Sequence, residues 1–195
     1  MDKLSRTRQN IIASSAALFN TYGYYGTSIS DVLQVSGYSK GALYNAFEDK
    51  EALVKEVFKY NLNRLQTAFI QAIAKKDNAR DKLCTIPMFY AEFDLEYVVP
   101  GGCPILNTAL ETDDAHPRLN TLVRSAFENW IAIIVGILEQ GKKTGEIKPD
   151  LISRSFALYM ISTIEGSIAL SKTYKDSGIL KQNMRLLTQH IQERI

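Results

Sequence analysis

Five residues between positions 39 and 45 have the chemistry needed to contact a nucleic acid, and all lie in the stretch GYSKGALYNAF. Lys40 can bind a phosphate or the edge of a guanine, and Asn45 can pair with adenine or bond a phosphate. The hydroxyl groups of Ser39 and Tyr44 can bond phosphate oxygens. Gly41 has no side chain, so a helix that carries it can approach a base pair closely. The pattern therefore predicts a helix face that reads DNA.

Two short helices joined by a tight turn must position these residues. Gly37 fits the turn, because glycine accepts a positive φ without strain, and Ser39 can cap the helix that follows. Ser28 with Asp31 three residues later resembles a capping box at the start of the preceding helix. The inner faces of the two helices consist of apolar residues: Ile29, Val32, Leu33, Leu43 and Phe47. This spacing is typical of a helix-turn-helix.

Further phosphate contacts are expected at the starts of two helices. Thr27 and Ser28 open the first short helix, where free N–H groups and the helix dipole favour an anion. Lys50 opens the next long helix and can hold another phosphate. The alternative is a helical hairpin whose exposed polar residues are only solvated.

Helical periodicity continues over almost the whole chain of 195 residues, and it predicts an all-α protein of about nine helices. The expected organisation is a three-helix head over residues 1–50 and a helical bundle over residues 51–195. No stretch is expected to span a membrane or to form a signal peptide, so we expect a cytoplasmic protein. The net charge of +2 is too small to indicate a partner, so a role on nucleic acid depends on where the charges lie.

The segment Thr7–Phe58, TRQNIIASSAALFNTYGYYGTSISDVLQVSGYSKGALYNAFEDKEALVKEVF, resembles the DNA-binding domain of the TetR family of bacterial repressors. The resemblance implies a dimer that binds double-stranded operator DNA, with the second helix of the motif in the major groove. It assigns the groove contacts to Ser39, Lys40, Gly41, Tyr44 and Asn45, and the phosphate contacts to Thr27, Ser28 and Lys50. One departure is Ala46, because the family usually has an aromatic residue or histidine just before the phenylalanine.

The resemblance also implies a site for an unknown small-molecule inducer in the bundle. A pocket of this kind needs apolar walls with a few polar anchors. The candidates are mostly aromatic: Phe89, Tyr90, Phe93, Tyr97, Cys103, Phe127, Trp130, Tyr159 and Glu165. The alternative is that most of them belong to the core.

The last two helices carry apolar stripes that suit a homodimer interface made of four helices. The expected interface residues are Phe156, Met160, Thr163, Ser167, Leu180, Met184, Leu187 and Ile191. A dimer would also supply two readers for a palindromic operator. The alternative is that these stripes pack within one chain.

Cys103 precedes Pro104 in the segment GGCPILN, and it is expected to be the N-cap of a short helix. A thiolate at that position is stabilised by the helix dipole, which lowers the pKa of the thiol. One interpretation is a repressor that senses oxidants or electrophiles through Cys103. The other is a small residue that fits a tight turn.

No set of catalytic residues is evident, and no enzyme activity or cofactor is expected. Acidic residues and a histidine gather in ETDDAHP, residues 111–117, but this segment is interpreted as a capping loop rather than a metal site. The leading hypothesis is a ligand-responsive transcriptional regulator that acts as a repressor and is released from its operator by a small molecule. A helical small-molecule binder without DNA binding is the alternative from another class.

Overall fold

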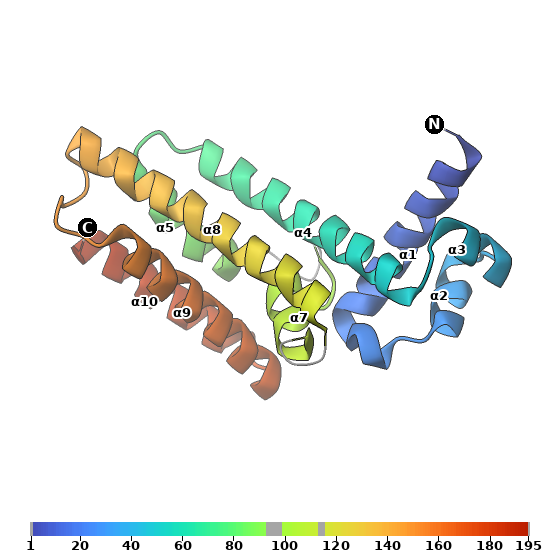
Figure 1. Ribbon diagram of the computed structural model, residues 1–195. Helices are drawn as coiled ribbons and strands as arrows, with labels where there is room; N and C mark the ends of the chain where they lie inside the picture. The colour runs from blue at the N-terminus through green and yellow to red at the C-terminus, as the bar shows by residue number, and fades with distance from the viewer. Residues whose placement is uncertain (1, 93–98, 113–115, 195) are drawn as a thin grey trace. The chain divides into compact units, whose positions relative to one another are not determined.

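The computed structural model describes residues 2–92, 99–112 and 116–194, and these residues form nine α-helices and no strand. The helices (Figure 1) are α1 (Lys3–Gly26), α2 (Ile29–Ser36), α3 (Lys40–Ala46), α4 (Lys50–Ala74), α5 (Ala79–Glu92), α7 (Pro104–Thr112), α8 (Pro117–Thr144), α9 (Ser153–Tyr174) and α10 (Ser177–Arg194). The all-α prediction is confirmed.

The chain divides into two compact units. Unit 1 comprises Met1–Leu65 and Glu96–Val123, and unit 2 comprises Gln66–Leu95 and Arg124–Ile195. This division by compactness is not the division at residue 50 expected from the sequence, because α7 and the first turns of α8 belong to the same unit as α1, α2 and α3. The expected functional boundary at residue 50 stays a prediction.

Unit 1 is built around α1, which packs against α2, α3 and α7. Its core takes apolar residues from α1 to α4 and from the start of α8. The buried members are Ile11, Ile12, Ala16, Phe19, Val32, Leu43, Ala46, Phe47, Leu53, Val54, Val57 and Leu119. Burial of this apolar surface is the main source of stability of the unit.

The helical path of α1 is broken at Gly23, which has φ 75° and ψ −176°. This region of backbone conformation is almost restricted to glycine. The break leaves the N–H groups of Tyr24 and Tyr25 without their helical partners, and the carboxylate of Glu111 on α7 accepts both at 2.8 Å. A Cβ at position 23 would overlap that carboxylate. Glycine is therefore required here for two independent reasons.

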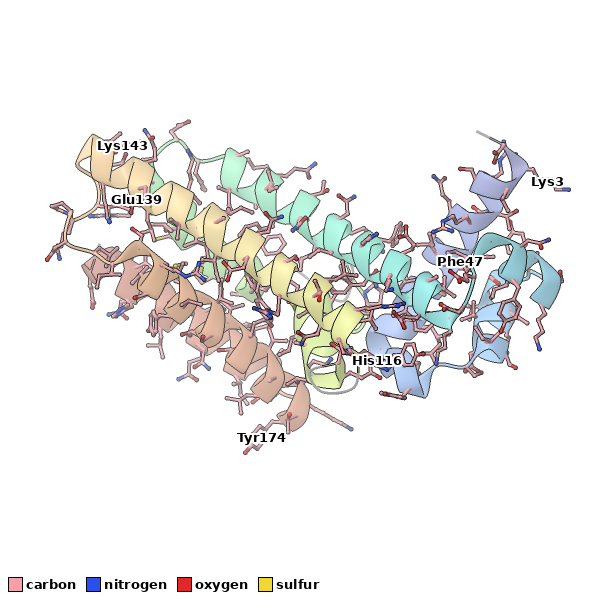
Figure 2. The ribbon with its side chains drawn as sticks, viewed as in Figure 1. Lys3, Phe47, His116, Glu139, Lys143 and Tyr174 are labelled. Atoms are coloured by element: carbon pink, nitrogen blue, oxygen red, sulfur yellow. The ribbon has the colours of Figure 1, made fainter. Side chains whose placement is uncertain are left out.

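Unit 2 contains α5, α9 and α10 together with parts of α4 and α8. Here α10 packs against both α5 and α9 (Figure 1). The buried faces of α9 and α10 include Met160, Ile164, Met184 and Ile191, each of which is fully buried. The C-terminal end of α8 (Glu139 and Lys143 are labelled in Figure 2) is linked to α9 by a hydrogen bond from the Ser153 hydroxyl to the Glu139 carboxylate.

One described helix, α8, is long and apolar enough to cross a membrane by length and composition alone. This differs from the expectation that no stretch would qualify, because the charged side chains of α8 are sparse in its central part. One third of its most apolar window is buried within the protein (33%). A core helix of a soluble protein passes the same test, so the observation is weak evidence for a membrane location.

The two glycines with positive φ in the head provide a matched test of the Gly23 break. Gly37 has φ 71° and open space around it, so Gly37→Ala should lose about 1–2 kcal/mol of unfolding free energy through backbone strain. Gly23→Ala should lose more, because it adds a collision with Glu111 to the strain. Urea unfolding followed by circular dichroism compares the two variants, and a smaller loss for Gly23→Ala would contradict this description of the break.

Candidate functional site

The helices α2 and α3 form a helix-turn-helix with a cap at each junction. Ser28 and Asp31 form a reciprocal capping box, in which the Ser28 hydroxyl accepts from the Asp31 N–H and the Asp31 carboxylate accepts from the Ser28 N–H. Gly37 ends α2 in the left-handed conformation. Ser39 then caps α3 by accepting from the Ala42 N–H at 3.2 Å. The predicted capping roles of Ser28, Ser39 and Gly37 are confirmed.

The short helix α3 has one buried face and one exposed face. Leu43 is 0% exposed, and Phe47, which directly follows α3 and is labelled in Figure 2, is 2% exposed. Both side chains hold α3 to the core of unit 1. The exposed residues are Ser39, Lys40, Gly41, Tyr44 and Asn45. These are the five residues predicted to enter the groove, so the structure brings them together on the solvent side of one helix.

All three predicted phosphate contacts have side chains that are already engaged within the chain. Thr27 is 1% exposed and its hydroxyl faces the Leu18 carbonyl at 3.5 Å. Lys50 donates to the Tyr24 carbonyl and lies over the Tyr24 ring at 4.2 Å, and burial lowers the pKa of its amine. Ser28 is exposed, and its hydroxyl donates to the Asp31 carboxylate at 2.7 Å and accepts from the Asp31 N–H in the capping box. Sequence reasoning placed Thr27 and Lys50 by their position at helix starts and could not foresee these internal partners.

The unusual Ala46 is part of the core rather than of the exposed face. Its side chain is 7% exposed and belongs to the buried cluster of unit 1. Asn45, which precedes it, is exposed. At this departure from the family pattern, Ala46 is a core contact of α3 and is not among the exposed residues of that helix.

Sequence reasoning missed three long-range contacts that organise this head, made by Arg8, Glu111 and His116. Arg8 donates to the Ala46 carbonyl at 2.6 Å, and Glu111 holds the broken end of α1. His116, at the start of α8 (Figure 2), packs on the Tyr24 ring with centroids 4.4 Å apart. Each partner is remote in the sequence, so periodicity and capping patterns carry no signal for these contacts.

Three of the predicted ligand-binding residues form an aromatic cluster in unit 2. The ring centroids of Phe89 and Tyr90 are 5.3 Å apart, and those of Tyr90 and Trp130 are 5.8 Å apart. Phe69 of α4, which is not among the predicted ligand-binding residues, contacts both Phe89 and Trp130. Trp130 is 5% exposed, and its indole N–H has no hydrogen-bond partner among the described residues. An unsatisfied buried donor is costly and is suited to a ligand acceptor.

The other ligand-binding candidates are dispersed. Glu165 is buried in unit 2 at 6% exposed, and Phe127 is half-buried. Tyr159 is 45% exposed and packs with His190 in an open hollow, with ring centroids 5.3 Å apart. Phe93 and Tyr97 lie outside the described residues.

Cys103 belongs to unit 1, and its side chain is fully buried at 0% exposed. Its carbonyl accepts from the Asn107 N–H at 3.1 Å, as expected of a residue that caps α7. Burial removes the access that a reactive thiol needs. The second cysteine of the chain, Cys84, is half-buried, and this burial raises the pKa of its thiol. The packing therefore favours the interpretation of Cys103 as a small residue in a tight turn.

Among the described residues, no group of three or more histidine, cysteine, aspartate or glutamate side chains is placed to hold a metal ion. Glu111 of this segment lies in α7, and its carboxylate accepts from backbone N–H groups of α1; the interpretation of residues 111–117 as a capping loop stays a prediction. Asp113 and Asp114 of this segment lie outside the described residues.

Comparison with known protein families identifies both parts of the chain. Residues 11–57 match the model of the bacterial regulatory proteins of the tetR family, and residues 79–187 match the tetracyclin repressor-like C-terminal domain. The chain belongs to the TetR family. It is a transcriptional regulator with a helix-turn-helix DNA-binding head and a C-terminal ligand-binding domain.

Individual TetR relatives are similar over nearly their whole length. A TetR-family regulator from Cytophaga hutchinsonii is 30% identical, with a TM-score of 0.95 over 100% of this chain and 97% of that one. A TetR regulator from Chloroflexus aurantiacus is 34% identical, with a TM-score of 0.92 over 100% and 98%. The transcriptional repressor DhaR of Mycobacterium sp. strain GP1 is 25% identical over 90% of this chain and 87% of its own.

TetR regulators act as dimers, but the stripes predicted to form the interface lie largely within this chain. Six of the eight predicted residues are at most 8% exposed: Phe156, Met160, Ser167, Met184, Leu187 and Ile191. Thr163 and Leu180 are half-buried. Intrachain packing, the alternative considered from the sequence, therefore describes the six buried side chains. In unit 2, α10 packs against both α9 and α5.

The capping box of the TetR head predicts a specific pH dependence. Hydrogen bonds from the Ser28 hydroxyl and N–H lower the pKa of Asp31 from its usual 3.8. A carboxyl group with a lowered pKa stabilises the fold above its unfolded pKa, and this contribution is lost as the pH falls through the folded pKa. The destabilisation caused by Ser28→Ala should therefore be greatest near neutral pH and should shrink below about pH 4.

Thermal unfolding of both proteins between neutral and acidic pH measures this difference. In an Asp31→Asn background the effect of Ser28→Ala should no longer depend on pH, because the titrating group is absent. A difference in melting temperature that stays constant with pH in the Asp31 background would contradict the role of the carboxylate.

Proposed function

We propose that this TetR-family protein is a cytoplasmic repressor that binds a palindromic operator as a homodimer and is released by a small molecule. The observation that carries the proposal is the division of α3 into two faces. Leu43 fixes the helix to the core, while Lys40, Tyr44 and Asn45 are exposed together. These side chains offer a charge for phosphate or guanine, a hydroxyl for phosphate and an amide for adenine.

The homodimer is best accommodated on the exposed faces of α9 and α10. Apolar residues on these faces have substantial exposed fractions: Leu158 44%, Tyr159 45%, Leu170 47% and Leu186 57%. Gly166 lies on the same side of α9, where an added Cβ would meet nothing within 4 Å, so a second helix could approach closely. Two paired copies would present two α3 helices, as a palindromic operator requires.

The effector site is proposed at the aromatic cluster of unit 2. Phe89, Tyr90 and Trp130 supply apolar walls, and the indole N–H of Trp130 is a buried donor that a ligand acceptor would satisfy. Buried Glu165 of the same unit is a candidate polar anchor. A ligand that binds one dimer geometry more tightly would shift the population away from the geometry that fits the operator.

Lys40→Ala tests the DNA-binding part of the proposal. Loss of a charged contact should weaken the operator complex roughly tenfold and reduce the slope of log affinity against log salt concentration by about 0.9 for each lost phosphate contact. Fluorescence anisotropy with the protein's own promoter DNA, over a range of salt concentrations, measures both quantities.

A scrambled duplex of the same length is the control for this experiment, and Lys175→Ala on an exposed position after α9 is the control for net charge. Wild-type protein that binds its promoter and the scrambled duplex equally would contradict the proposal. That result would favour a helical small-molecule binder whose head does not read DNA.

Leu186→Glu tests the proposed dimer face. A charge on an exposed leucine at the centre of an interface would be desolvated on association, so we expect monomers in sedimentation velocity and weaker operator binding at the same protein concentration. Ile70→Glu is a matched control, because Ile70 is 51% exposed on α4. A Leu186→Glu protein that remains dimeric would place the interface elsewhere.

A further inference from the structure

Arg8 on α1 connects three helices of the head through its guanidinium group. Its Nη1 donates to the Ala46 carbonyl at 2.6 Å, at the last residue of α3. The guanidinium carbon lies 4.5 Å from the centroid of the Phe47 ring. Its Nη2 is 3.8 Å from the carboxylate of Glu56 on α4. One side chain therefore contacts the end of α3, the residue after it, and the helix that follows.

The Ala46 carbonyl is one of the carbonyls at the end of α3 that need a partner from outside the helix. The last four carbonyls of a helix lack intrahelical donors, and α3 has only seven residues. A cationic donor at a helix C-terminus also interacts favourably with the helix dipole. Arg8 meets both needs, and its planar group stacks on the Phe47 ring as an ammonium group could not.

We propose that Arg8 is a positioning residue for DNA recognition, which fixes the C-terminal end of α3 and thereby the direction in which Lys40, Tyr44 and Asn45 project. The proposal rests on the proposed function, since it assumes that α3 reads DNA. Arg8 acts through α3 and does not bind a phosphate itself.

The contacts of Arg8 distinguish it from the other basic residues near the start of α1. Its guanidinium is engaged by a carbonyl and an aromatic face, and the Glu56 carboxylate nearby offsets its charge. Arg6, two residues earlier, is exposed. Removal of Arg8 should therefore change how well α3 fits its target more than the number of counterions released on binding.

The test compares full-length Arg8→Ala, Arg8→Lys and Arg6→Ala with the wild type. Each protein is titrated by fluorescence anisotropy with an operator duplex selected from random sequences and with a scrambled duplex, at several salt concentrations. Arg8→Ala should weaken operator binding roughly tenfold, the scale of a hydrogen bond to a charged group. Binding to the scrambled duplex and the salt slope should stay unchanged. Arg8→Lys should recover operator affinity only in part, because lysine keeps the charge and a donor but loses the planar group that stacks on Phe47.

Three results would overturn the proposal. One is a salt slope that falls by about 0.9 or more in Arg8→Ala, with equal weakening on both duplexes, which is the behaviour of a phosphate contact. Another is full recovery of operator affinity in Arg8→Lys. The third is an unchanged operator affinity in Arg8→Ala. Arg6→Ala provides the reference for loss of a charge at the same end of the same helix.

Two further measurements keep the proposal testable if Arg8→Ala unfolds. Glu56→Gln leaves the bond to Ala46 in place and removes the carboxylate that lies 3.8 Å from Arg8 and also pairs with Lys59, so it should lower operator affinity less than Arg8→Lys does. Hydrogen exchange of the free protein should be faster at residues 43–47 in Arg8→Lys than in the wild type, and equal rates would contradict the positioning role. Failure of the proposed function is distinguishable, because the wild type itself would then show no preference for any duplex.

Discussion

A seven-residue helix cannot maintain its own conformation in water, and the head of this protein depends on one. Short isolated helices are unstable because the entropy lost in forming the first turn exceeds the free energy gained from a few internal hydrogen bonds. The position of α3 is therefore imposed from outside: Ser39 caps its start, Leu43 anchors its middle, and Arg8 holds its last carbonyl. Exposed side chains on such a helix are only as well placed as these supports.

The same dependence extends to the segment that precedes α2. Gly23 interrupts α1, and the two N–H groups exposed by the break are bonded by Glu111 of α7. Lys50 holds the Tyr24 carbonyl from the start of α4. The entry to the helix-turn-helix is thus shaped by residues from α4 and α7 as well as by α1. This explains why α7 and the start of α8 are part of unit 1.

Local patterns in the sequence were sufficient for the helices, the caps and the two faces of α3, because each depends on residues at most four positions apart. Long-range contacts were not predictable in this way: Arg8 meets Ala46 across 38 positions, and Glu111 meets Tyr24 across 87.

The stripes on α9 and α10 were correctly recognised as apolar, but periodicity does not say whether an apolar face meets the same chain or another copy. Met160 and Met184 are buried by intrachain neighbours. Phe69 was missed as a partner of Trp130 because the contact joins two distant helices.

The bond between Glu111 and the end of α1 bears on how regulators of this kind can be recombined. Glu111 lies within the part of the chain that matches the C-terminal domain, whereas Tyr24 and Tyr25 lie within the part that matches the DNA-binding head. The two are separable as sequence families but interlocked as a folding unit. In a fusion of this head to a foreign C-terminal domain, the N–H groups of Tyr24 and Tyr25 would lack a hydrogen-bond acceptor, unless the foreign domain supplied a carboxylate at the position of Glu111. The exchangeable module is therefore the head together with α7 and the first turns of α8.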